Sequence, residues 1–493
     1  MKNKTVLALI WNGVDKFFFQ FVSLIVGIIT ARFLSPQDFG YIGALAVFTM
    51  LSNILVESGF TSALIRRDGN TDEEYSAIFF VNILIAVVIY LILFFSAPYI
   101  ALFFRMPELC SLSRFLFLSI IINSFGIVQN IILSKSLSFK VISLADLTSA
   151  VVSGIATVLM VLNGVGYWAL AWQIFLQNVV RVLFLWLASS WRVSFHPTFG
   201  IIKDVFTFSS FMLFASFINT IVKNIYSVII GRLFNPALLG FYSQANKYQQ
   251  IPSTVIQSAI SGVAYPMLSN LKSDEDRQLM YLRRIVKVTA CAIFPIMFGL
   301  SALMSSLVSI LLTDKWLPAV PYFQMLVPVA IVLPFHSLNL NLILIRGHSK
   351  VNFMLETIKN TLTLLSIFIV FVGSQFAFGG WQFELSIEAL LISFSVANVI
   401  SYVCDSMTAQ RLASYRVFDQ FMDIAPYAFV GALMFLFVMG VEWVNSHFMI
   451  LDSKIILVAI QMLLGVLFYL AMLKLLGSKV YEDIMDIVKR RRV

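Results

Sequence analysis

Charged and amide side chains stand inside long apolar stretches of this chain. The deep lysines are Lys16, Lys223, Lys247 and Lys359, and the acids near them are Asp15, Glu57 and Glu356. A lysine at the centre of a bilayer costs roughly 2.5–3.5 kcal/mol on insertion scales, so such residues tend to face a bundle interior or an aqueous cavity. Because the lysines outnumber the acids, a cavity lined by them would suit an anionic substrate.

Amide side chains accompany one of these lysines. Asn246 and Gln250 recur with Lys247 at helical spacing, which places them on one side of a helix. We therefore predict that Asn246, Gln250 and the four lysines line a substrate pathway. For Lys16 the alternative is an internal ion pair with Asp15 or Glu57, and for Lys359 it is a pair with Glu356, one turn away.

The acids suggest a second kind of chemistry. A carboxylate in a low-dielectric environment binds a proton or a cation readily. Glu57 and Asp15 are therefore candidate sites for H⁺ or Na⁺ coupling, and a structural salt bridge is the alternative for each. We find no Walker motif, no HExxH or CxxC metal spacing, no GxSxG and no dinucleotide loop. The sequence thus predicts no bound cofactor or metal.

The elements that position these residues are membrane helices. Apolar residues make up 60% of the 493, charged residues only 12%, and the mean hydropathy is +0.91. A hydrocarbon core of ~30 Å needs roughly 20 helical residues. We predict an all-α polytopic membrane protein with about fourteen spans, near 6–33, 39–65, 75–104, 112–134, 142–163, 166–188, 206–231, 237–267, 284–312, 318–345, 351–373, 384–408, 423–445 and 454–476.

A duplicated motif organises these spans. Ala31-Arg32-Phe33-Leu34-Ser35-Pro36 followed by Phe39-Gly40-Tyr41 returns 200 residues later as Gly231-Arg232-Leu233-Phe234-Asn235-Pro236 followed by Leu239-Gly240-Phe241. Six spans separate the copies, so both halves enter the membrane from the same side. We predict an N-lobe over 1–205, a C-lobe over 206–415, a two-helix appendage over 416–476 and a basic cytoplasmic tail over 477–493. Two equivalent lobes are typical of a transporter, and a scaffold without a pathway is the alternative.

The distribution of basic residues sets the orientation. With a cytoplasmic N-terminus, 23 Lys and Arg fall in cytoplasmic segments and 6 on the opposite side, in keeping with the positive-inside rule. The predicted C-terminus is also cytoplasmic. This asymmetry accounts for the net charge of +9 without a nucleic-acid partner, and the basic tail adds contact with anionic membrane lipids.

Several segments together resemble a known family. ARFLSPQDFGYIGALAVF, SGFTSALIRR, YSQANKYQQIPSTVI, DKWLPAVPYFQML and LILIRGHSKVNF resemble the polysaccharide exporters of the multidrug/oligosaccharidyl-lipid/polysaccharide (MOP) superfamily, above all the Wzx-type, colanic-acid-exporter-like proteins. The resemblance covers roughly residues 5–410.

That resemblance implies a flippase in a bacterial inner membrane. Such proteins move undecaprenyl-diphosphate-linked oligosaccharide repeat units from the cytoplasmic to the periplasmic leaflet by alternating access through a central cationic cavity. Lys16, Lys223, Lys247 and Lys359 are the positions that would hold the diphosphate, and ion gradients would drive turnover. A polymerase and export machinery are the implied protein partners.

Two other functions compete with a flippase. A drug or small-cation exporter of the same superfamily is expected to carry cavity carboxylates in excess, whereas lysines prevail here. An integral membrane glycan polymerase or ligase needs an extended outward loop that presents reactive side chains, and no predicted outward loop is long enough. We therefore expect a transporter rather than an enzyme.

Overall fold

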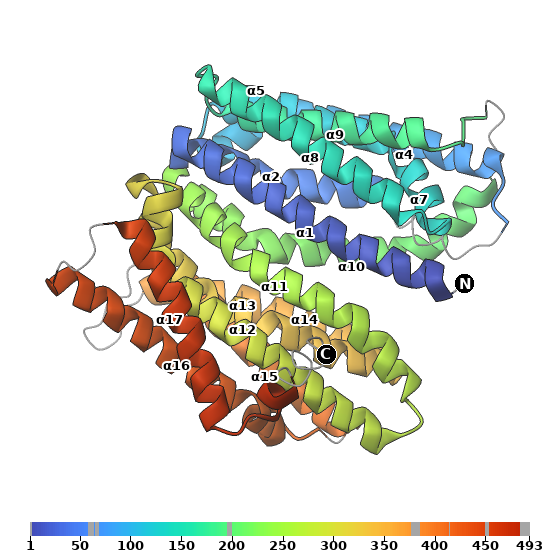
Figure 1. The fold of residues 1–493 in the computed structure, drawn as a ribbon. Helices are drawn as coiled ribbons and strands as arrows, with labels where there is room; N and C mark the ends of the chain where they lie inside the picture. The colour runs from blue at the N-terminus through green and yellow to red at the C-terminus, as the bar shows by residue number, and fades with distance from the viewer. Residues whose placement is uncertain are drawn as a thin grey trace. The chain divides into compact units, whose positions relative to one another are not determined.

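The computed structural model describes residues 2–57, 64, 69–194, 200–375, 385–413, 415–448 and 453–483, with side chains beginning at Phe18 in the first helix and at Leu213 in the helix that starts at Gly200. Within these residues every regular element is a helix (Figure 1). The chain divides into two compact units, Met1–Ser243 and Gln244–Val493. The lobe boundaries drawn from the duplicated motif stay a prediction.

The first unit is built from antiparallel helices. They are α1 (Lys2–Phe33), α2 (Pro36–Glu57), α4 (Asp72–Phe104), α5 (Leu109–Leu116), α6 (Leu118–Ser124), α7 (Ile127–Lys135), α8 (Phe139–Leu162), α9 (Trp168–Ala188) and α10 (Gly200–Leu233). Helix α8 packs between α1 and α9, and α2 packs on α10 and α4. Helix α4 begins with a capping box, in which the Thr71 hydroxyl accepts from the Glu74 N–H and the Glu74 carboxylate accepts from the Thr71 N–H.

The second unit begins within a long helix. Its elements are most of α11 (Pro236–Asn270), α12 (Glu275–Leu311), the short 3-10 helix η1 (Asp314–Trp316), α13 (Ala319–Ile345), α14 (Ser349–Gln375), α15 (Ile387–Ala413), α16 (Val417–Phe448) and α17 (Lys454–Leu475). Helix α15 packs on α13 and α14, while α12 packs on α13, α16 and α17. Helix α11 meets α13 through the Ser253 hydroxyl, which donates to the Ala330 carbonyl at 2.8 Å.

Each predicted membrane span overlaps at least one described helix. Twelve helices among the described residues are long and apolar enough to cross a membrane, so the prediction of an all-α multi-pass membrane protein is confirmed. The two predicted spans outside these twelve lie on α1, whose described side chains cover only Phe18–Phe33, and on α11, whose many polar residues lower its hydropathy. The predicted fourth span is three helices in series, α5, α6 and α7. At their junctions the backbone forms hydrogen bonds of the 3-10 type, between residues three apart. One example joins the Gly126 N–H to the Asn123 carbonyl at 2.9 Å.

The two copies of the duplicated motif contact each other. Helices α2 and α11 begin at Pro36 and Pro236, and a Cβ added to Gly40 would lie 1.9 Å from the Pro236 carbonyl oxygen. A Cβ added to Gly240 would lie 1.8 Å from the Pro36 carbonyl oxygen. The motif glycines therefore allow the first turns of α2 and α11 to meet backbone to backbone, and the contact is reciprocal.

Candidate functional site

Lys223 lies deep within α10. It stands ten residues before the helix ends at Leu233, which corresponds to about 15 Å of helix. Its side chain is exposed, whereas Tyr226, one turn along, is buried. Among the described carboxylates none forms an ion pair with the Lys223 ammonium. An exposed, unpaired ammonium at this depth needs water or an anion as its partner.

Lys247 occupies a comparable depth in α11. It stands eleven residues after the helix begins at Pro236, about 16 Å along the axis. The residue is exposed and pairs with no described carboxylate. Beside it, the Asn246 side-chain oxygen accepts hydrogen bonds from Gln250 Nε2 at 3.0 Å and from Gln249 Nε2 at 3.1 Å. The structure thus brings Lys247, Asn246 and Gln250 together on one helix.

Buried polar atoms surround this part of α11. Gln244 Nε2, the Tyr248 hydroxyl and Gln249 Oε1 are buried and have no hydrogen-bond partner among the described residues. An unsatisfied buried polar group costs about 1–3 kcal/mol, so such groups usually meet water or a ligand. A polar ligand that reached this stretch of α11 would therefore gain hydrogen bonds.

Lys359 is held in a polar cluster on three helices of the second unit. Its ammonium lies 3.0 Å from Glu356 Oε2 on the same helix and 3.3 Å from His336 Nε2 on α13. His336 Nε2 also lies 3.4 Å from Glu356 Oε1, and His336 Nδ1 is hydrogen-bonded to Asp405 Oδ2 on α15. Of the two possibilities for Lys359, the ion pair with Glu356 is therefore present, and we call these four residues the His336 cluster.

Polar contacts extend from this cluster toward α16. Asn339 Nδ2 lies 3.3 Å from the Ser406 hydroxyl and 3.4 Å from Gln420 Oε1. The Tyr402 hydroxyl donates to the same Gln420 oxygen at 3.3 Å. Because these bonds join α13, α15 and α16, they fix the mutual rotation of the helices that carry the His336 cluster.

A second charged group ties α12 to α16. Asp423, only 4% exposed, accepts from Arg283 at 2.7 and 2.9 Å, from Lys287 at 3.1 Å and from the Tyr415 hydroxyl at 2.9 Å. Burial and the adjacent carboxylate raise the pKa of the Tyr415 phenol, which keeps it a hydrogen-bond donor at neutral pH. With two cations and one phenol on one carboxylate, this group is a structural clasp.

The other predicted site residues lie in the first unit. Lys16 and Asp15 are on α1, and their side chains lie outside the described residues. Glu57 ends α2 and is exposed. Arg181 on α9 pairs with Asp146 on α8 and donates to Asn130 at 3.3 Å, an interaction that the sequence analysis did not identify.

Two buried acids, Asp405 and Asp423, were not among the predicted site residues. Both stand in predicted spans, and their partners, His336 and Arg283, lie on other helices. The signal that identifies them is simple: a carboxylate inside an apolar stretch needs a partner wherever it is found.

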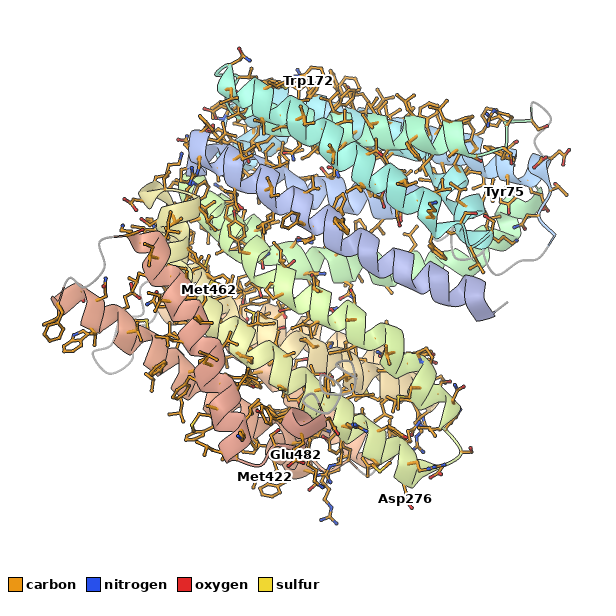
Figure 2. The ribbon with its side chains drawn as sticks, viewed as in Figure 1. Tyr75, Trp172, Asp276, Met422, Met462 and Glu482 are labelled. Atoms are coloured by element: carbon orange, nitrogen blue, oxygen red, sulfur yellow. The ribbon has the colours of Figure 1, made fainter. Side chains whose placement is uncertain are left out.

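An apolar cavity lies along α12, α16 and α17. Its volume is about 540 Å³. Its lining includes Pro295, Met434, Gly465 and Met462, the last labelled in Figure 2. Gln461 is its one amide, and Gln461 Oε1 has no hydrogen-bond partner among the described residues. This surface suits a hydrocarbon chain rather than a polar molecule.

These helices and their internal charged groups define a multi-pass membrane protein with polar sites inside its bundle. The chain belongs to the polysaccharide biosynthesis protein family, whose model matches residues 29–321. The resemblance predicted from the sequence is thereby confirmed.

Individual comparisons agree with this assignment. The teichuronic acid biosynthesis protein TuaB of Bacillus subtilis (strain 168) is 25% identical over 431 residues, 86% of each chain. The lipopolysaccharide biosynthesis protein WzxC of Escherichia coli (strain K12) is 20% identical over 383 residues, 76% of each chain. The solved structure of the lipid II flippase MurJ in an inward closed conformation has a TM-score of 0.73 at 15% identity, covering 97% of this chain and 100% of that one. The likeness to MurJ establishes the fold.

Proposed function

We propose that this protein is a flippase for an oligosaccharide linked to undecaprenyl diphosphate, which it moves from the cytoplasmic to the periplasmic leaflet of a bacterial inner membrane. The observation that carries the proposal is the pair of exposed lysines, Lys223 and Lys247. Each lies about 15–16 Å from the nearer end of a membrane-length helix and has no described acid partner. The charge on each is costly there unless an anionic group or water compensates it.

A lipid-linked diphosphate matches these features in two respects. Its phosphates carry negative charge and strong acceptor oxygens, which the Lys223 and Lys247 ammonium groups and the amides of Asn246 and Gln250 are suited to bind. Its polyprenyl chain is apolar and needs a hydrocarbon-like surface, which the cavity along α12, α16 and α17 offers. Lys16 and Lys359 complete the proposed set of cationic contacts.

The comparisons support the same substrate class. TuaB and WzxC are biosynthesis proteins of teichuronic acid and lipopolysaccharide, and MurJ, whose fold this chain shares, is a lipid II flippase. Lipid transfer between leaflets breaks no covalent bond, so the proposal needs no catalytic residue. The proposal includes alternating access of the two lobes, H⁺ or Na⁺ coupling through Glu57 or Asp15, and cytoplasmic termini.

The proposal is tested by export in a strain that lacks the gene. We expect Lys223→Ala and Lys247→Ala to reach the membrane at normal levels, to abolish surface-glycan export and to cause lipid-linked oligosaccharide to accumulate. Lys350→Ala is the matched control, since Lys350 is an exposed lysine in the first turn of α14. Full export by the double Lys223/Lys247 variant at normal protein level would remove both residues from the site.

A further inference from the structure

The His336–Asp405 pair of the His336 cluster is buried, whereas the side chains of Glu356 and Lys359 are 23% and 27% exposed. His336 stands nine residues before α13 ends at Ile345, and Asp405 eight residues before α15 ends at Ala413, each about 12–14 Å of helix. Asp405 is 0% exposed and His336 7%. At this depth a net charge is not compensated by bulk water, so the charge balance of the cluster decides its protonation.

The charges of the cluster balance only when it holds an additional proton. With a neutral imidazole, Asp405 and Glu356 contribute two negative charges and Lys359 one positive charge, which leaves the cluster at −1. One proton on the His336–Asp405 pair brings the cluster to zero. Asp405 Oδ1 has no hydrogen-bond partner among the described residues, so the carboxylate depends on its bond to His336.

Two hydrogen-bond arrangements are available to the imidazole. In the neutral ring Nδ1–H donates to Asp405, and Nε2 accepts from the Lys359 ammonium at 3.3 Å. In the protonated ring Nε2 becomes a donor, and its acceptor is Glu356 Oε1 at 3.4 Å. The imidazolium then repels Lys359 and competes with it for Glu356. Proton binding therefore loosens the hold of the cluster on Lys359.

Charge balance acts in the same direction. If the Lys359 ammonium left the unprotonated cluster, two negative charges would remain without a cation, one of them on the fully buried Asp405. If it left the protonated cluster, only one would remain. A proton on the cluster thus lowers the cost of moving Lys359 to another partner.

From these contacts we propose that His336 and Asp405 form a proton-binding site whose occupancy determines whether Lys359 is retained by Glu356 and His336 or is released to bind an anionic group. Proton and anion then bind cooperatively, because each favours the same arrangement of Lys359. The anionic group in question is the diphosphate of the proposed substrate, so this second half of the inference rests on the proposed function.

The site suits a proton rather than a metal cation. Lys359 Nζ lies 3.3 Å from the imidazole and would repel a second cation. No group of three or more His, Cys, Asp or Glu among the described residues is arranged to hold a metal ion.

The groups around His336 come from four helices. Glu356 and Lys359 face it from α14, and Asp405 faces it from α15. The Tyr402 ring, also on α15, lies tilted to the Phe335 ring with the centroids 6.1 Å apart. The two residues that flank His336 in the sequence contact uncharged groups. Phe335 contacts the ring of Phe294 on α12, and the Ser337 hydroxyl is hydrogen-bonded to the Ser261 hydroxyl on α11. Among the described residues, the charged side chains that face the His336–Asp405 pair are therefore Glu356 and Lys359.

The first half of the proposal is tested by NMR on the full chain in lipid nanodiscs. The chain has only four histidines, so ¹⁵N-labelled imidazoles can be resolved, and His336→Gln identifies the signal. We expect this signal to report a proton that binds and dissociates between about pH 5 and 9. In Asp405→Asn the protonated fraction at pH 7 should fall several-fold, whereas Lys350→Gln should leave it unchanged. A wild-type signal that is constant across the range, or one unaffected by Asp405→Asn, would overturn the proton site.

The second half is tested with farnesyl diphosphate, a soluble prenyl diphosphate. The measured quantity is the ratio of the apparent Kd at pH 8 to the apparent Kd at pH 6. We expect this ratio to be at least threefold larger in wild type than in His336→Gln, and the comparison corrects for titration of the probe itself. One coupled proton can change the Kd by up to about tenfold per pH unit. Lys350→Gln should behave as wild type. Equal ratios in wild type and His336→Gln, or no binding at either pH, would overturn the link to Lys359. If the wild-type protein exports no lipid-linked oligosaccharide but its NMR titration is as expected, the result counts against the proposed function alone.

Discussion

The reciprocal contact between Gly40 and Gly240 predicts a specific loss of stability. A Cβ at Gly40 would lie 1.9 Å from the Pro236 carbonyl oxygen, and observed Cβ atoms essentially never approach within 3.0 Å. The backbones must therefore separate by about 1.1 Å, and no flexible side chain can yield instead. Overpacking of this kind costs about 1–3 kcal/mol, and the helix preference for alanine returns up to about 1 kcal/mol. Because the obstacle is backbone, the cost lies at the upper end of that range, about 3 kcal/mol, and subtracting about 1 kcal/mol leaves a net loss of about 2 kcal/mol for Gly40→Ala and for Gly240→Ala.

Thermal unfolding of the purified protein in lipid nanodiscs measures this loss. Both variants should unfold at a lower temperature than wild type. Gly262→Ala on α11 is the matched control, because an added Cβ there meets nothing within 4 Å, and it should match or exceed wild type. The double Gly40/Gly240 variant should lose less than the sum of the single losses, since one separation relieves both clashes. Wild-type stability in either single variant, or strict additivity, would refute the contact between the two motif copies.

Two further predictions concern the second unit. Asp423→Ala should destabilise the protein by about 1–3 kcal/mol, because it leaves Arg283 and Lys287 without their shared anion. This figure already allows for the partial exposure of both cations. Unchanged thermal unfolding would contradict the role of Asp423 in joining α12 to α16. Gly299→Leu should fill the apolar cavity and lower glycan export at normal protein level, because a Cβ added there meets only Met434 Cε, at 3.4 Å. Gly373→Leu, at a position with nothing within 4 Å, should not lower export. Equal export by both leucine variants would argue against a role for the cavity.

The helices were predictable because membrane helices follow from local composition. A run of about 20 apolar residues forms a helix wherever it crosses a bilayer, and Pro36 and Pro236 mark where α2 and α11 begin. The division of the fourth span into α5, α6 and α7 was not predictable in this way. Those breaks depend on hydrogen bonds of the 3-10 type at Phe117 and Gly126. Such bonds are favoured there by packing against other helices rather than by the local sequence.

The candidate site was predictable only where partners share a helix. The spacing of Glu356 and Lys359 identified their pair, and the structure contains it. The bonds of His336 to Asp405 and of Arg283 to Asp423 join different helices. Such contacts depend on which helices are neighbours and how each is rotated, and neither follows from the periodicity of a single segment. The depth of Lys223 and Lys247 followed from their spans, whereas their exposure required coordinates.

The most direct test of the central claim measures movement of lipid between leaflets. The purified protein is reconstituted into liposomes that contain a fluorescent oligosaccharide linked to undecaprenyl diphosphate, and a membrane-impermeant quencher reports the fraction in the outer leaflet. We predict that the wild-type protein makes the inner-leaflet fraction accessible over time and that the double variant Lys223→Ala/Lys247→Ala does not. The claim would be contradicted if quenching with the wild-type protein followed the time course of protein-free liposomes although the wild-type protein and the Lys350→Ala control were both folded and inserted.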